Sequence, residues 1–139
     1  MEKTLIILKP DCMNGMHAGK TISRFEKEGF RICACKMIQL TDALLKDHYS
    51  HLADMPFFPN IVEFMSSTPV IVLVLQGENA ISRVRTLLGP TDSAVAEKGT
   101  IRGDLGTNKQ ENIAHVSDSP EAAEAEMKRF FADSEICSL

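Results

Sequence analysis

Residues Val70 to Leu75 form an unbroken apolar run, which strongly constrains the fold of the chain. A strand with one face in water alternates polar and apolar side chains, whereas a buried strand is apolar throughout. The run therefore predicts a buried strand. With 139 residues, 44% of them hydrophobic, the chain is long enough to bury a core, and we expect one globular domain over residues 1–139.

The other segments alternate between strand and helix patterns. Apolar spacing predicts helices that end near Gly29, that start after a cap at Thr41, and that cover residues 60–66, 80–88 and 120–131. Further strands are expected over residues 3–9, 31–40 and 114–117. The βαββαβ order, with extra helices after the second strand, favours an α+β ferredoxin-like antiparallel sheet sandwich. Residues 89–111 show little periodicity, and long loops of this kind are usually functional or disordered.

The segment from Asn112 to Ser119 places His115 on a short extended stretch just before a helix start. Ser119 followed by Pro120 is typical of an N-cap and a first helical residue. A histidine so placed can act as a nucleophile, and the helix N-terminus favours anionic groups nearby.

Glu126 falls on the edge of the apolar face of this last helix, beside Ala123 and Phe130. A carboxylate in that position must be paired or reach water. Two interpretations remain open. Glu126 forms an ion pair at the edge of the face, or it hydrogen-bonds a ring nitrogen of His115 and fixes the orientation of the ring.

Charge and cysteine usage exclude some classes of function. The net charge of −4 argues against a general nucleic-acid binder, so a phosphate site would be a local basic cluster. Cys33 and Cys35 flank Ala34 in an expected strand and should share one face; we interpret the cysteines as small buried apolar residues rather than zinc ligands. No signal-peptide pattern or membrane-spanning apolar run is present, which favours the cytoplasm.

Several motifs in order give the chain a resemblance to the nucleoside diphosphate kinases over nearly its whole length. They are Thr4 to Asp11, Arg24-Phe25-Glu26, Gly29-Phe30, His48-Tyr49, Pro56-Phe57-Phe58, Ser67 to Val70, Gly77 to Ala80, Leu88 to Thr91, Gly99 to Arg102 and Asn112 to Ser119. The resemblance implies the ferredoxin-like fold. It also implies transfer of the γ-phosphoryl group of a nucleoside triphosphate, typically ATP, to nucleoside diphosphates through a ping-pong phosphohistidine intermediate on His115.

The resemblance also assigns roles to individual residues. Without it, Lys9 would be a solvent charge at a strand end, Arg85 an exposed helix cation and Phe57 a core residue. With it, Lys9, Tyr49 and Ser117 join His115 and Glu126 in the catalytic group. The nucleotide-binding residues are then Lys9, Phe57 and Ile61 around the base and phosphates, with Arg85, Thr91, Arg102 and Asn112 contacting phosphate and ribose. Arg102 would reach phosphate from a flexible glycine loop.

The cofactor and partners follow from the same resemblance. Mg²⁺ is expected to be carried by the nucleotide phosphates, because the sequence shows no dedicated carboxylate cluster. The partners are ribo- and deoxyribonucleoside triphosphates and diphosphates, with no nucleic acid or membrane. A homo-oligomer, a tetramer or hexamer, is expected.

The chain departs from the family at Val116, where relatives usually carry glycine or another small residue, and at Met55, where a basic residue is common. It also departs at Lys109-Gln110-Glu111, a more charged approach to Asn112 than many relatives show. A valine would be strained if that backbone had a positive φ. A catalytically silent nucleotide-binding module on the same fold is therefore an alternative. Two further alternatives are an RNA-binding module and a metal enzyme using His17, His48 and His51, which we interpret instead as solvent-facing histidines.

Overall fold

The computed structural model describes the whole chain, Met1 to Leu139, and is built on one four-stranded sheet. The strands are β1 (Glu2–Leu8), β2 (Arg31–Ile38), β3 (Val70–Gly77) and β4 (Ala114–Val116). They lie in the order β2-β3-β1-β4, and every neighbouring pair is antiparallel. The expected α+β ferredoxin-like sandwich is confirmed.

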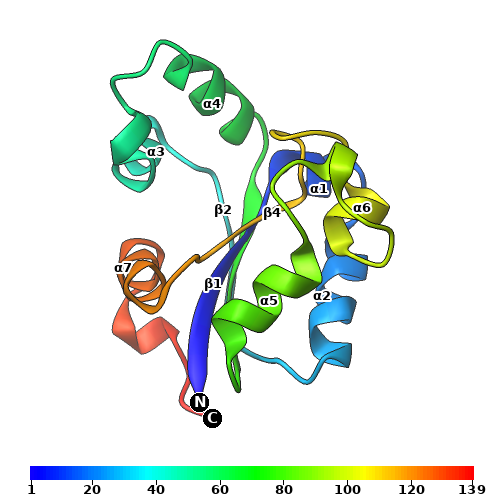
Figure 1. Cartoon of the computed structure of the whole chain (residues 1–139). Helices are drawn as coiled ribbons and strands as arrows, with labels where there is room; N and C mark the ends of the chain where they lie inside the picture. Colours follow the sequence, from blue (N-terminus) through cyan, green and yellow to red (C-terminus); the bar gives the residue numbers. More distant parts are fainter.

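Helices cover both faces of this sheet (Figure 1). They are α1 (Pro10–Asn14), α2 (Ala18–Lys27), α3 (Asp42–His48), α4 (Phe58–Met65), α5 (Ala80–Leu88), α6 (Ile101–Leu105) and α7 (Pro120–Phe130). Short 3₁₀ turns lie at η1 (Ser50–Leu52), η2 (Ser93–Val95) and η3 (Asp133–Glu135). No helix is both long enough and apolar enough to cross a bilayer.

Alternate residues of the central strands enter two separate cores. Ile6 and Leu8 of β1 pack with Phe25 of α2 and with the buried side of α5. Leu5 and Ile7 point the other way and pack with residues of α3, α4 and α7. Because both faces are covered, β3 is apolar almost throughout and β1 is apolar from Leu5 to Leu8, which confirms the prediction of a buried strand at Val70 to Leu75.

The predicted helix starts agree with the structure at their caps. The Thr41 hydroxyl accepts from Leu44 N at 3.2 Å, and the Ser119 hydroxyl accepts from Ala122 N at 3.0 Å. Two short helices were not predicted, α1 and α6. The interpretation of residues 89–111 as an unpatterned loop is wrong for α6, which is too short to show periodicity and depends on tertiary contacts.

The prediction that Cys33 and Cys35 share a face is wrong. The β2–β3 register shifts between Ile32 and Ala34, so a bulge at Cys33 interrupts the alternation of side chains. Cys33 is therefore buried and Cys35 exposed. Cys137 is also exposed, so only Cys12 and Cys33 are the buried apolar residues that we expected.

The interpretation of His48 as a solvent-facing residue is also wrong, because it is only 8% exposed. The side chain lies between α3 and α7, where its ring contacts Phe130. His51 is exposed, as expected, and His17 is half-buried.

Candidate functional site

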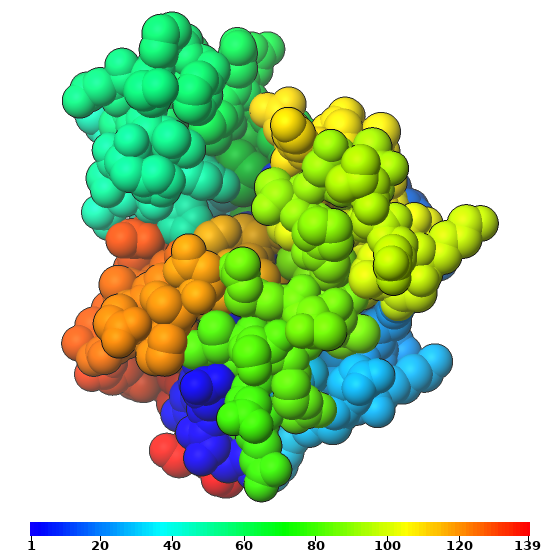
Figure 2. Space-filling model, viewed as in Figure 1, coloured from blue at the N-terminus to red at the C-terminus, as the bar shows by residue number.

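A cleft of about 940 Å³ opens between the η1–α4 region and the segment that carries α6, with β4 at its floor. Figure 2 shows the hollow between these two parts of the surface. Nine of the residues singled out from the sequence line it, although they come from distant parts of the chain: Lys9, Tyr49, Phe57, Ile61, Arg85, Thr91, Arg102, Asn112 and His115. Ser117 and Glu126 are not in the lining and lie behind His115.

His115 is held from behind by α7. It pairs with Ile7 in the β1–β4 ladder, and its Nε2 lies 2.9 Å from Glu126 Oε2. Ser117, directly after the end of β4, where its N–H still donates to Leu5 O of β1, donates from Oγ to Glu126 Oε1 at 2.6 Å. Strand residues two apart share a face, so both side chains reach the same carboxylate. Of the two interpretations of Glu126, the hydrogen bond to His115 is the one that the structure contains.

The charge on Glu126 determines which nitrogen of His115 carries the proton. Burial acts to raise the pKa of Glu126, but the hydrogen bonds and charge of His115 and the bond from Ser117 outweigh it, and the pKa lies below its usual value. The carboxylate is therefore ionised at neutral pH and can only accept. Nε2 of His115 must then be the N–H, which leaves the lone pair on Nδ1.

His48 forms a second layer behind this pair. Its ring meets the His115 ring edge-on, with centroids 4.6 Å apart and an interplanar angle of 83°. Arg129 Nη1 donates to His48 Nδ1 at 3.0 Å, and Arg129 Nε is bonded to Asp47. Burial, with the neighbouring His115, lowers the pKa of His48 to about 3, so its ring is neutral.

His48, His115 and Glu126 also place three possible ligand atoms within 4.8 Å of one another. A metal would need a lone pair from each histidine. His48 already accepts from Arg129 at Nδ1, and in a neutral imidazole the other nitrogen then carries the proton. As arranged, His115 and Glu126 form a hydrogen-bonded pair against which the His48 ring packs, rather than a metal centre, and His17, His48 and His51 do not converge.

Lys9 follows β1 and is only 8% exposed, so it is not a solvent charge at a strand end. Its Nζ donates to Gln110 O at 2.6 Å and to Asn112 Oδ1 at 2.8 Å, which leaves one of its N–H groups free. Burial lowers the pKa of Lys9 to about 8; Asp11 opposes that shift and Arg102 adds to it.

Arg102 does not lie in a flexible glycine loop, as the sequence suggested. It belongs to α6, and its guanidinium donates to the carbonyls of Asn112, Gly89 and Ala114 at 3.0, 3.1 and 2.7 Å. Burial, followed by the charge of Arg85, lowers its pKa to about 10. Arg102 therefore braces the backbone around the cleft, in addition to any contact with a ligand.

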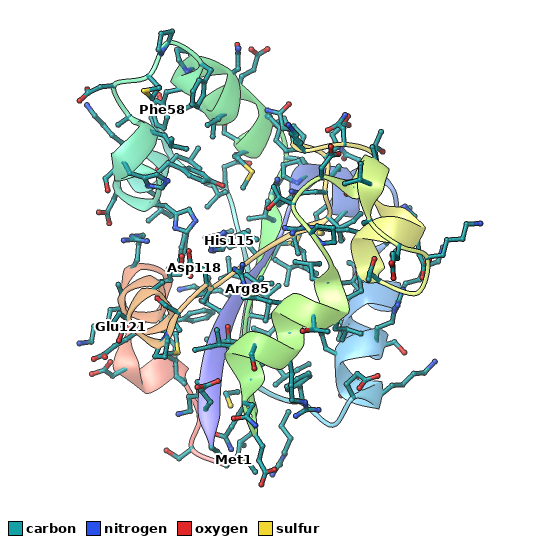
Figure 3. All side chains as sticks on the ribbon, viewed as in Figure 1. Met1, Phe58, Arg85, His115, Asp118 and Glu121 are labelled. Atoms are coloured by element: carbon teal, nitrogen blue, oxygen red, sulfur yellow. The ribbon has the colours of Figure 1, made fainter.

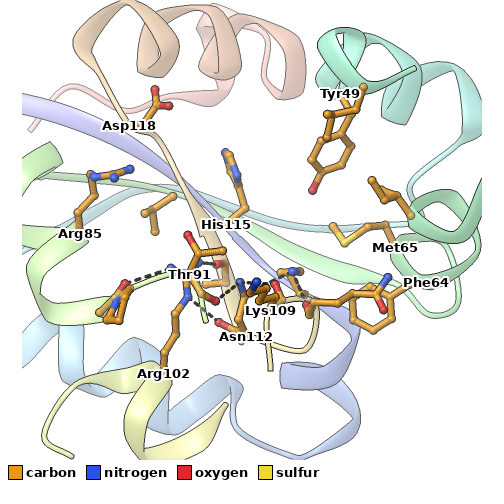
Figure 4. A pocket seen from close by; sticks show the side chains of 18 of the residues that line it. Tyr49, Phe64, Met65, Arg85, Thr91, Arg102, Lys109, Asn112, His115 and Asp118 are labelled. Carbon is orange, nitrogen blue, oxygen red and sulfur yellow. Dashed lines mark hydrogen bonds between the residues drawn. The ribbon is translucent and has the colours of Figure 1, made fainter. Parts of the chain in front are cut away.

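The Asn112 side chain also binds backbone carbonyls around the cleft. Its Nδ2 donates to Thr91 O and Lys109 O, each at 2.9 Å, while its Oδ1 accepts from Lys9. These bonds tie the segment after α5 to the segment before β4 (Figure 4).

The backbone just before His115 is strained. Ile113 has φ of 76°, and Ala114 N donates to Asn112 O at 2.9 Å, which closes a γ-turn around it. A β-branched residue with positive φ is uncommon and costs on the order of 1–3 kcal/mol. The positive φ that we considered for Val116 is absent, since Val116 lies in β4 with extended backbone.

The opposite wall of the cleft is apolar. Phe57 caps the N-terminus of α4 and is 43% exposed, and Ile61 follows it one turn later. Tyr49 lies deeper, with its hydroxyl directed toward the middle of the cleft (Figure 4), and burial raises its pKa to about 12, so it remains protonated.

Two charged lining residues had no role assigned from the sequence. Asp118 lies near His115 and Arg85 (Figure 3), and its place in the Asn112 to Ser119 motif was the only available signal. Lys109 lines the cleft next to Asn112, and the sequence marks it only as part of a charged approach to Asn112.

A cleft with an apolar wall for a ring, cations for phosphates and a carboxylate-bound histidine at its floor is typical of a nucleotide-dependent phosphotransferase. A family model described as nucleoside diphosphate kinase matches residues 2–136. The chain belongs to the nucleoside diphosphate kinase family.

Relatives and solved structures agree. The chain is 53% identical to the nucleoside diphosphate kinase of Parabacteroides distasonis, over 98% of this chain and 89% of that protein. It is 46% identical to the enzyme of Methanothermobacter thermautotrophicus, over 99% and 92%. Its fold matches that of the Aquifex aeolicus enzyme with a TM-score of 0.92 and 48% identity, over 97% and 98% of the two chains. A Halobacterium salinarum enzyme in complex with CDP matches with a TM-score of 0.95 and 36% identity, over 99% and 92%.

The protein is therefore a phosphotransferase with nucleoside diphosphate kinase function. Nothing in these comparisons favours the silent regulatory module or the RNA-binding module.

Proposed function

We propose that His115 is the group that carries the phosphoryl between nucleotides. Nδ1 attacks the γ-phosphorus of a nucleoside triphosphate, the bond to the β–γ bridging oxygen breaks, and a nucleoside diphosphate leaves. A second diphosphate then attacks phosphohistidine and departs as a triphosphate, which returns the lone pair to Nδ1. The observation that carries this proposal is the Nε2 contact to ionised Glu126 at 2.9 Å, which directs the lone pair of Nδ1 away from α7.

Glu126 and Ser117 are proposed to hold the ring and to offset the positive charge that it gains. Phosphorylation of Nδ1 while Nε2 keeps its proton makes the ring cationic, and a carboxylate 2.9 Å away stabilises that state. Ser117 fixes the carboxylate by its own hydrogen bond.

The phosphate-binding group is proposed to be Lys9, Arg85, Thr91, Arg102 and Asn112. Lys9 has one free N–H group, and the Arg102 guanidinium, with three of its five N–H groups bonded to carbonyls, still has two to offer. Because Lys9 and Arg102 are already fixed by backbone carbonyls, they would need little reorganisation when phosphate arrives. The Tyr49 hydroxyl is proposed to donate in the same region.

The base is proposed to stack on Phe57, with Ile61 on the other side of the slot. Stacking uses the face that every base possesses, so nucleotides of all bases are expected to bind. The proposed substrates include both ribo- and deoxyribonucleotides. The CDP in the complex of the Halobacterium salinarum enzyme is consistent with this substrate class.

Mg²⁺ is proposed as the cofactor, carried by the nucleotide. Asp118 is the only carboxylate in the cleft lining, too few oxygen ligands for a dedicated protein site. Bound to the phosphates, the ion would neutralise part of their charge.

We further propose that residues 1–139 act as one kinase domain in the cytoplasm, as a tetramer or hexamer, without nucleic-acid or membrane partners. The free cysteines suit a reducing compartment, and the net charge of −4 does not favour polyanions in general. The outer edge of β2, with Met37 61% exposed, is a surface that another subunit could cover.

Intact-protein mass spectrometry after brief mixing with ATP and Mg²⁺ tests the proposal, with His115→Ala as the control. We expect a gain of one phosphoryl mass that requires His115, survives alkali and disappears on a chase with GDP. ATP binding without any mass gain would overturn the role of His115, and Val116→Gly would then be the first variant to examine.

A further inference from the structure

The strained turn at Ile113 is held in place from every side. Ile113 is 1% exposed, and its N–H donates to Asp11 Oδ2 at 2.9 Å. Its carbonyl accepts from Lys9 N at 2.9 Å, and Arg102 binds the carbonyls of Asn112 and Ala114 on either side. Each peptide group of the turn therefore has a fixed partner.

Of these partners, Asp11 is the one that the proposed chemistry leaves unused. Asp11 lies in the first turn of α1, and it is not among the residues that line the nucleotide cleft. Lys9 and Arg102 are assigned to the phosphate, whereas the carboxylate of Asp11 faces the backbone that leads to His115.

The geometry gives this contact a specific task. An isoleucine returns to negative φ unless its surroundings oppose the change. That change would rotate the two peptide groups at Ile113, and the strand begins only one residue later, at Ala114. His115 is the next residue, so relaxation of the turn would displace its ring from the cleft floor.

We propose that Asp11 is a positioning residue for the transfer reaction: by accepting from Ile113 N, it keeps the γ-turn that sets the direction of His115. The inference rests on the proposed role of His115. Asp11 also lies close enough to Lys9 for its charge to favour protonated Lys9. The hydrogen-bond acceptor and the negative charge are thus two separable contributions of one side chain.

The variants Asp11→Ala and Asp11→Asn separate these contributions. Alanine removes both, whereas asparagine keeps an oxygen that can accept from Ile113 N. We expect Asp11→Ala to slow single-turnover phosphorylation of His115 by on the order of tenfold or more, as loss of an outer-shell partner does elsewhere. Asp11→Asn should restore most of that rate below the pKa of Lys9.

The variant Ile113→Gly tests the turn itself. Glycine adopts positive φ without strain, so the turn should need Asp11 less. The factor by which Asp11→Ala slows phosphorylation of His115 should therefore be clearly smaller in the Ile113→Gly background than in the wild type. If Ile113→Gly does not fold, Ile113→Asn replaces it, because asparagine also tolerates positive φ.

Glu2→Ala is the matched control, since Glu2 Oε1 accepts a backbone N–H from Ile81 at 2.8 Å in another part of the molecule. It should leave the phosphorylation rate unchanged. Three results would overturn the inference. Asp11→Ala could slow phosphorylation by the same factor in both backgrounds, it could weaken only nucleotide affinity, or Asp11→Asn could be as slow as Asp11→Ala. Absence of phosphohistidine in the wild type would instead overturn the proposed function.

Discussion

Glu126→Gln should slow phosphorylation of the enzyme because it removes charge while it keeps shape. The glutamine carbonyl can still accept from His115 Nε2, and its amide can face Ser117. Ser117 Oγ lies 3.5 Å from Leu5 O, so its hydroxyl proton has another acceptor to turn to. The variant therefore retains the tautomer of His115 and loses the negative charge beside it.

The magnitude follows from the kind of hydrogen bond that is replaced. A bond to a charged group contributes roughly 1.5–3 kcal/mol and a neutral one roughly 0.5–1.5 kcal/mol. The difference, about 1–1.5 kcal/mol, corresponds to about a fivefold to tenfold effect on a rate. Since the ring becomes cationic as Nδ1 is phosphorylated, the transition state loses more, and we expect a loss of roughly 10- to 100-fold.

The assay is single-turnover quench-flow with labelled ATP, which separates nucleotide affinity from the phosphorylation rate. Ser117→Ala should cause a smaller loss, and the double variant should be little slower than Glu126→Gln alone, since Ser117 acts through the carboxylate. A phosphorylation rate of Glu126→Gln within about twofold of the wild type would refute the reasoning. So would a double variant whose rate reduction equals the product of the reductions caused by Glu126→Gln and Ser117→Ala.

The pH dependence gives the same test a second readout. The folded pKa of Glu126 is below its usual value of 4.5, so its contribution to stability and rate is present above that value. It should be lost as pH falls through the folded pKa. In Glu126→Gln the loss of stability over this acid range should be smaller than in the wild type, as measured by urea titrations at a series of pH values.

Four further outcomes are expected. The kcat/KM of the wild type should fall as pH rises through about 8, where Lys9 loses its charge, and Lys9→Arg should move that limb to higher pH in a pH–rate profile. Arg102→Leu should remove the side-chain donor from the carbonyls of Gly89 and Ala114 and one of the two donors from Asn112 O, and should lower the free energy of unfolding by about 2 kcal/mol or more in urea titrations. Phe57→Ala should weaken binding of ADP, GDP and CDP about equally, by roughly 1–3 kcal/mol in calorimetry. Ser119→Ala should lower stability by about 1 kcal/mol through loss of the α7 cap, with an unchanged phosphorylation rate.

The sequence was sufficient where local chemistry decides the structure. Ser119 before Pro120 predicts the start of α7, and the apolar run at Val70 predicts a buried strand, because caps and periodicity act within a few residues. The pairing of Glu126 with His115 was also within reach, since helical spacing placed a carboxylate at the edge of an apolar face just after the histidine.

The remaining features depend on contacts between distant residues. The positive φ of Ile113 is accompanied by a hydrogen bond from its N–H to Asp11, about a hundred positions earlier. His48 is buried because Arg129 of α7 satisfies its ring nitrogen. The bulge at Cys33 reflects pairing with β3, and no local pattern marks any of these positions.

The electrostatics of the cleft explain how an acidic protein can hold a polyphosphate. The cleft is lined by four cations (Lys9, Arg85, Arg102 and Lys109) and by one carboxylate, that of Asp118, although the chain has a net charge of −4. Burial lowers the pKa of Lys9 to about 8 and of Arg102 to about 10, so the free enzyme keeps these cations at a cost. A bound phosphate favours the charged forms of Lys9 and Arg102, so the unfavourable desolvation free energy of these side chains is offset only when substrate is present. Backbone carbonyls hold both side chains in the meantime, so the cost of orienting them is met during folding rather than during the reaction.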